Sequence, residues 1–305
     1  MGTVMSAEER REHIRPTLER NVKKYKKCPD VTVNQAVVMF CSASSDSLQQ
    51  HLNRRKQVSY PVASWMSKLA EKLANLSPNP KLAGLGALAV AIFIDAISAT
   101  SSSDTTRDAL RCVFAEEKAS EVWDQIDECL KRCVMHIDNN NELMTDIRRT
   151  ECQLSAALTK LKNSMARDGQ MSSRALKAWV NGAALHIQML IHLLRLGGSQ
   201  SCDPVQRLLS TYLSELDLLF TNHKAAVRRK CDLDCDVLQD CPCPYFETEE
   251  GEAYYVAQFI TFEEYFEAYY DYHYSSQKYK IRKYFEKVME DLPMLVRQVG
   301  HLSVS

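Results

Sequence analysis

The chain has 305 residues, of which 45% are apolar and 25% are charged, and its formal net charge is −1. These values are ordinary for a globular protein and exclude global disorder and a collagen-like repeat. Gly and Pro number only nine each. That is too few for the many tight turns of a sandwich or propeller, so we predict a mostly helical chain.

Charge is distributed unevenly along the chain. Residues 1–230 carry 32 Lys and Arg against 24 Asp and Glu, residues 231–277 carry 0 against 12, and residues 278–305 carry 6 against 3. An acidic block beside a basic body indicates a separate acidic segment or one that folds back onto the body. The basic residues form no stripe interleaved with aromatic side chains, so we expect no nucleic acid partner.

The N-terminus matches the pattern for myristoylation, with Gly2 after the first Met and Ser6 four positions further on. A single myristoyl chain holds a membrane only marginally and needs a second signal. A helix is predicted over residues 6–27, and lysines at its end could supply that signal on an anionic membrane surface. These candidates are Lys23, Lys24, Lys26 and Lys27. The alternative is a solvated helix end, where cations complement the helix dipole.

The first thirty residues contain no apolar stretch of the kind that a secretory signal needs. We therefore expect a cytoplasmic protein that can also associate peripherally with a membrane. In that compartment the eleven cysteines are expected to be reduced thiols.

After predicted helices over residues 33–55 and 62–76 comes the least typical segment. Residues 82–94 carry no charge, Asp95 follows, and eight more uncharged residues come next. This run is too short for a spanning helix, which needs about 20 apolar residues, so we predict a helix over 82–100 that is buried at the centre of a bundle. The alternative is a segment that contacts or enters a membrane. Its candidate contact residues are Leu85, Leu88, Ile92, Phe93 and Asp95.

Apolar residues spaced three and four apart predict long helices over residues 104–133, 142–167, 173–197 and 203–230. The last of these opens on Asp203-Pro204, which predicts an Asp cap followed by Pro at the first helical position. Helices of this length, joined by short polar or Gly turns, indicate an elongated antiparallel bundle.

Individual side chains on these helices are interpreted as packing residues. Trp179 is expected to pack in the core. Glu151 is the single charged residue among the apolar positions that repeat along the predicted helix over residues 142–167. His186 and His192 lie six residues apart, about 240° around the helix, so they are not a ligand pair. We expect them on the helix surface or hydrogen-bonded in the core.

The chain changes character after residue 230. Four cysteines with the spacing C-x3-C-x5-C-x-C do not form the C-x2-C pairs of zinc sites, so they are weak metal candidates in what we expect to be a disordered acidic linker. These are Cys231, Cys235, Cys241 and Cys243. Helices are predicted over residues 261–272 and 275–298, the second docking on the bundle. Ten of the thirteen tyrosines lie between 245 and 284, and we favour an aromatic packing patch over sites for tyrosine kinases.

Two stretches resemble segments of an uncharacterised group of fish helical proteins. They are FAEEKASEV at residues 114–122 and SMARDGQMSSRALKAWVNGAA at residues 164–184. The resemblance covers residues 60–230 and implies a helical fold without an assigned activity. In outline, an apolar segment followed by long helices is also similar to rapunzel-like proteins and to α-helical pore-forming proteins of the haemolysin E type. No shared motif transfers a site to this chain.

The sequence therefore predicts an all-α, elongated antiparallel helical bundle with a buried apolar helix and an acidic Tyr-rich C-terminal segment. Its parts are an N-terminal helical arm (residues 1–58), the bundle (59–230), and the acidic Cys- and Tyr-rich segment with a C-terminal helix (231–305). No set of acid, base and nucleophile at usable spacing occurs, so we expect no enzyme and no cofactor. The predicted function is a non-enzymatic scaffold or interaction protein. It would contact protein partners or itself through helices, and associate reversibly with an anionic membrane surface. The alternative is a conditional pore-forming protein that inserts residues 82–103.

Overall fold

A computed structural model of the chain describes residues 7–25, 29–33, 135, 139–197, 201–234, 244–257 and 260–297. Most of these residues are helical, which confirms the prediction of a mostly helical chain. The structure adds a small three-stranded sheet that the sequence did not predict. The helices expected over residues 33–55, 62–76, 82–100 and 104–133 lie outside the described residues.

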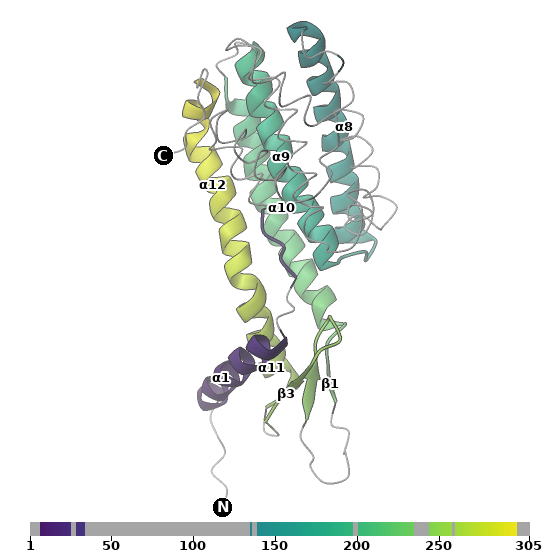
Figure 1. Cartoon of the computed structure of the whole chain (residues 1–305), viewed down its shortest axis with the longest axis vertical. Coiled ribbons are helices and arrows are strands. Elements are labelled where there is room, and N and C mark those ends of the chain that lie inside the picture. The colour runs from purple at the N-terminus through teal and green to yellow at the C-terminus, as the bar shows by residue number, and fades with distance from the viewer. Residues whose placement is uncertain are drawn as a thin grey trace, which may run out of the picture.

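Four long helices lie side by side along the longest axis of the molecule (Figure 1). They are α8 (Asn140–Arg167), α9 (Ser173–Gly197), α10 (Asp203–Arg228) and α12 (Ser276–Arg297). Helix α9 packs against the other three, whereas α8 and α12 stand at opposite edges of the group. The colour gradient of Figure 1 shows that successive helices run in opposite directions.

Local chemistry explains where these helices begin and end. The Asn139 side chain accepts hydrogen bonds from the backbone N–H groups of Asn141 and Glu142, so α8 begins two residues earlier than predicted. It ends before Gly169, whose φ of +72° is the left-handed conformation that glycine adopts most easily. The predicted Asp203 cap is wrong. Cys202 occupies the cap position without a side-chain hydrogen bond, and Asp203 is the first helical residue, where its charge still complements the helix dipole.

Helix α9 is buried on all sides over residues 178–189. The sequence assigned this role to residues 82–100, which lie outside the described part of the chain. Gly182 lets α8 approach α9 closely, because a Cβ atom at this position would lie only 2.6 Å from Cδ2 of Leu158. A small residue is therefore needed where these two helices cross.

The sheet follows α10 directly. Strands β1 (Asp232–Asp234), β2 (Tyr245–Glu247) and β3 (Ala253–Tyr255) are antiparallel in the order β1-β2-β3. Asp234 is paired with Tyr245, and Tyr245 with Tyr255. The prediction of a disordered linker is therefore wrong for the strand residues, because Phe246 and Tyr254 bury their rings in the core. Residues 235–243 lie outside the described part.

The C-terminal helices form one continuous run. Helix α11 (Phe262–Tyr270) begins at a capping box between Thr261 and Glu264, and the π-helical turn η1 (Asp271–Ser275) joins it to α12. Both predicted helices are confirmed, and α12 docks on α9 and α10 as expected. Packing of the aromatic patch is also confirmed for four tyrosines that are nearly or fully buried. They are Tyr265, Tyr269, Tyr270 and Tyr274.

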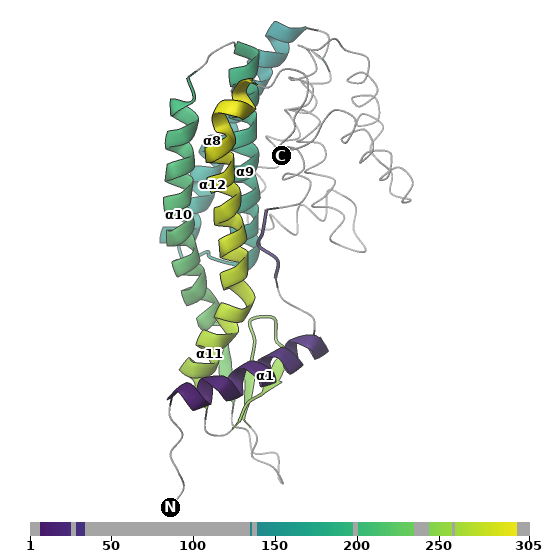
Figure 2. The same ribbon diagram turned by 90° about the vertical axis from the view of Figure 1, so that its left-hand side faces the viewer.

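Helix α1 (Ala7–Tyr25) crosses the end of the molecule that carries the sheet (Figure 2). It packs against α11 and β3, and the side chains of Ile14 and Leu18 are buried there. The Asn21 amide donates to the hydroxyl oxygen of Tyr265 and to the backbone carbonyl of Tyr255, at 3.2 Å each. These contacts join the first described segment of the chain to the acidic C-terminal segment.

Residues 29–33 lie against α9 and the first turn of α12. The Gln277 side chain accepts a hydrogen bond from the Val31 N–H at 2.8 Å and donates one to the Pro29 carbonyl at 3.1 Å. Asn181 on α9 donates to the Thr32 carbonyl at 3.3 Å. Within the described ranges, no helix is long and apolar enough to cross a membrane.

Candidate functional site

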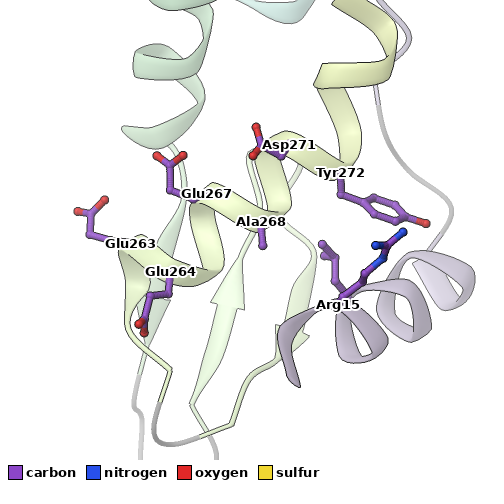
Figure 3. A pocket seen from close by; sticks show the side chains of 8 residues that line it. Arg15, Glu263, Glu264, Glu267, Ala268, Asp271 and Tyr272 are labelled. Atoms are coloured by element: carbon purple, nitrogen blue, oxygen red, sulfur yellow. The ribbon is translucent and has the colours of Figure 1, made fainter. Parts of the chain in front are cut away.

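A surface cavity of about 670 Å³ lies between α1 and the segment formed by α11 and η1 (Figure 3). Arg15 extends from α1 toward Tyr272, and the carboxylates of Glu263 and Glu267 point away from α1. The remaining lining residues are Leu18, Glu264, Ala268 and Asp271. The cavity is therefore bordered by four carboxylates, one guanidinium and an exposed tyrosine ring.

Most of these carboxylates already have cationic partners. Glu264 accepts a hydrogen bond from Arg10 at 2.8 Å, Glu267 is paired with Lys224 at 2.5 Å, and Glu263 is paired with Arg228. The Arg228 guanidinium lowers the pKa of Glu263, and the Thr261 backbone N–H lowers the pKa of Glu264. These groups stay ionised at neutral pH, so they suit electrostatic contacts better than proton transfer.

A buried polar network lies where the sheet, α9, α10 and η1 meet. Nε2 of His223 is 2.9 Å from Oγ of Ser173, and Nδ1 of His223 is 3.0 Å from the hydroxyl of Tyr270. Ser173 also lies 3.3 Å from Oε2 of Glu249, whose other oxygen accepts a hydrogen bond from Tyr274. No local pattern in the sequence indicates this group, because its members come from positions as far as 101 residues apart.

Proton counting restricts the states of this network. Tyr270 donates its proton to the Phe220 carbonyl, so its oxygen accepts from Nδ1–H of His223, and Nε2 must accept from Ser173. Ser173 then has no proton left for Glu249. Burial raises the pKa of Glu249, and only the protonated carboxyl group can donate to the Ser173 oxygen.

The contact between Ser173 and His223 has the distance of a nucleophile and its base. Its surroundings differ from those of a catalytic pair, because His223 is fully buried and Ser173 is 7% exposed. Burial lowers the pKa of His223 to about 4, so the imidazole is neutral at pH 7. The arrangement can hold three elements together through hydrogen bonds, but it does not offer the serine to a substrate.

A second histidine lies in the π-helical turn. His273 is 6% exposed and lies against the rings of Tyr269, Tyr272 and Tyr274. Its Nε2 has no hydrogen-bond partner among the residues that the structure describes, and burial lowers its pKa to about 4. Its backbone carbonyl accepts a hydrogen bond from Gln277 at 2.8 Å, the residue that also holds residues 29–33.

A third network links α8, α9 and α10. His186 on α9 lies 2.6 Å from Oε1 of Glu151 through Nε2 and 2.6 Å from the Tyr212 hydroxyl through Nδ1. Of the two placements predicted for His186, the helix surface or a hydrogen-bonded position in the core, the structure shows the second. Glu151, the single charged residue among the apolar positions of α8, is the hydrogen-bond partner of His186. The hydrogen bond from His186 lowers the pKa of this carboxylate.

Glu151 and His186 are expected to be energetically coupled. In a double-mutant cycle with Glu151→Gln and His186→Asn, we expect a coupling energy of about 1–3 kcal/mol, because each single change leaves a buried polar partner without its bond. Urea unfolding of the four proteins measures it. The exposed pair of Arg15 and Glu19 on α1 serves as the control, with an expected coupling of about 0.5 kcal/mol or less. Additive effects of Glu151→Gln and His186→Asn would contradict the prediction.

The structure describes only some of the residues that were predicted to contact a membrane or to bind a metal. Lys23 and Lys24 are exposed in the last turn of α1. Cys231 is 7% exposed at the end of α10, where burial raises its pKa to about 12 and disfavours the thiolate that a metal needs. The other candidates lie outside the described residues: Gly2, Lys26, Lys27, Leu85, Leu88, Ile92, Phe93, Asp95, Cys235, Cys241 and Cys243. Across the described positions, no group of three His, Cys, Asp or Glu side chains could hold a metal ion.

Comparison with known proteins identifies no relative. No family model matches the chain, and no curated protein and no solved structure matches it either.

Proposed function

We propose that this protein is a non-enzymatic helical scaffold of the cytosol. The four long helices would belong to an elongated antiparallel bundle that encloses residues 82–100, and helix surfaces would contact protein partners or a second copy of the chain. Reversible association with an anionic membrane would use a myristoyl group on Gly2 together with basic side chains.

One observation carries this proposal. The polar networks around His223 and His186 join different helices and are largely buried. Networks of this kind rigidify a fold, whereas a catalytic group must reach a substrate. The accessible cavity beside α1 is lined by carboxylates that are mostly paired with cations, which favours a role in contacts over a role in chemistry.

The membrane part of the proposal rests on the exposed positions of Lys23 and Lys24. A myristoyl chain alone binds with an association constant of about 10⁴ M⁻¹, so its attachment is reversible and depends on additional basic residues. Cations near an anionic leaflet add about 1 kcal/mol each.

Co-sedimentation with vesicles that contain a trapped dye tests this proposal. The full-length protein, with and without myristoylation, is mixed with neutral or phosphatidylserine-containing vesicles. We expect binding to the anionic vesicles, strongest for the myristoylated protein, with the dye retained. Dye release would instead support the conditional pore former that inserts residues 82–103, and Asp95→Leu should then alter the leak without altering binding. No binding to any vesicle would overturn the membrane part of the proposal.

A further inference from the structure

One side of α12 carries an exposed group of basic residues together with a tyrosine ring. Tyr279, Lys283 and Lys287 follow one another at four-residue spacing, and Lys280 lies three residues before Lys283, so all four share one side of the helix. All four side chains are exposed, and the Tyr279 side chain is 63% exposed. We name these four residues the basic face of α12.

The basic face points away from the core. Helix α12 packs on α9 and α10 through the opposite side, which carries the fully buried Ile281 and Phe285. It also stands at one edge of the four long helices, with α8 at the other edge (Figure 1). A flat surface can therefore approach α12 without displacing another described helix.

The three lysines of the basic face differ from the other cations of the same helix. Lys278 and Arg282 lie 2.9 and 2.6 Å from the carboxylate of Asp217 on α10. By contrast, no carboxylate of the described residues forms an ion pair with the three lysines of the face. Glu286 is paired with Arg282 at 3.6 Å, whereas the exposed Glu290, three residues after Lys287, adds one negative charge to this side of the helix.

Tyr279 adds a second feature of a membrane contact. Its ring lies 5.9 Å from Nζ of Lys283, so the aromatic side chain stands among the cations of the face. Tyrosine is enriched at the interface between lipid and water because its ring is apolar and its hydroxyl is polar. Lysine can likewise bury its aliphatic stem while its charge remains at the level of the headgroups.

We propose that the basic face of α12 binds the surface of an anionic lipid bilayer. This inference rests on the proposed function and supplies the second signal that a single lipid chain requires. Three lysines near an anionic leaflet strengthen binding about a hundredfold. Together with a myristoyl chain of about 10⁴ M⁻¹ they give an association constant of about 10⁶ M⁻¹. The exposed Lys23 and Lys24 at the end of α1 are the alternative candidates for this second signal.

Vesicle binding of a charge-neutralised variant tests the proposal. Lys280→Gln, Lys283→Gln and Lys287→Gln are combined in one variant. The matched control combines Arg148→Gln, Arg149→Gln and Arg174→Gln, which removes three exposed cations from α8 and α9. Both variants change surface residues only, and thermal unfolding verifies that each is folded. We expect the α12 variant to bind phosphatidylserine-containing vesicles about a hundredfold more weakly than the parent, and the control within about twofold of it. Binding of the parent should fall steeply with added salt.

Different results separate a failure of this inference from a failure of the proposed function. In one outcome, the parent and the α12 variant bind anionic vesicles equally well, and Lys23→Gln combined with Lys24→Gln abolishes binding. This outcome would overturn the proposal that the basic face binds lipid, but it would support the proposed membrane association. If neither the myristoylated nor the unmodified parent binds any vesicle, both proposals are overturned. A parallel titration with a DNA duplex tests whether the basic face binds nucleic acid instead of an anionic lipid surface. Loss of duplex binding in the α12 variant, without loss of vesicle binding, would assign the face to nucleic acid and overturn the lipid proposal.

Discussion

The free energy of unfolding is expected to fall by about 3 kcal/mol for each of His223 and His273 as the pH drops from about 6.5 to about 4. Both side chains are buried, and burial lowers the pKa of each to about 4. In the unfolded chain they take up protons below about pH 6.5, whereas in the folded protein they stay neutral. The unfolded state therefore binds more protons in this window, and stability is lost as the pH falls.

Other titrating groups near these histidines modify the size of the effect. Glu249, which reaches His223 through Ser173, has a pKa raised by burial, so its protonation at lower pH favours the folded state and partly offsets the loss. Lys230 is the cation that acts on His223 from the end of α10. The groups facing His273 are the rings of Tyr269, Tyr272 and Tyr274.

Urea unfolding at several pH values between 4 and 7 measures this dependence. The two histidines should contribute about 2.7 kcal/mol per pH unit to the slope where both titrate only in the unfolded chain, and His223→Gln or His273→Gln should each remove about half of that contribution. His13→Gln, which changes an exposed histidine on α1, is the matched control and should leave the contribution of His223 and His273 in place. A slope that survives both substitutions would show that other groups cause the acid sensitivity.

Replacing Trp179 with Ala is expected to destabilise the protein by about 3–5 kcal/mol. Trp179 is fully buried on α9, and its ring packs edge-on against Tyr212 of α10 with centroids 5.5 Å apart. Tyr212 in turn contacts Phe285 of α12. Removing the indole leaves a large cavity at the point where three of the four long helices meet, and the helices cannot close it without losing these contacts.

A conservative substitution separates packing from hydrogen bonding at this position. Nε1 of Trp179 has no hydrogen-bond acceptor among the described residues, so Trp179→Phe removes an unsatisfied donor along with part of the ring. We expect it to cost about 1.5 kcal/mol or less. Equilibrium unfolding in urea compares the two variants with the parent. Equal losses for Ala and Phe would indicate that the indole nitrogen, and not the volume of the ring, determines the stability.

Local signals in the sequence determined most helix boundaries. The Asn139 cap, Gly169 and the Thr261 capping box act over three or four residues, so their effect is independent of the rest of the fold. The same locality explains one error. Asp203 and Pro204 indicate a helix start, but they do not distinguish the cap position from the first helical residue.

The candidate sites required the tertiary structure. Glu151 and His186 both stood out in the sequence, but no local sequence pattern indicated that the two side chains, which lie on α8 and α9, contact each other. The membrane and metal candidates near Gly2, in 82–103 and in 235–243 remain predictions, since they lie outside the described residues. The basic face of α12 is readable as a spacing of lysines. Only the packing of α12 on α9 and α10 decides that this side is the exposed one.

The sequence by itself determined that the described part of this protein is mostly helical, and it determined which segments form its four described long helices, because periodicity and capping operate within a few residues. The tertiary structure alone decided that Arg10 pairs with Glu264, that α9 occupies the buried position, and that a serine, a histidine and a glutamate meet under the sheet. Such contacts join residues up to 254 positions apart. They depend on how apolar surfaces of whole elements are buried together, which no short stretch of sequence encodes.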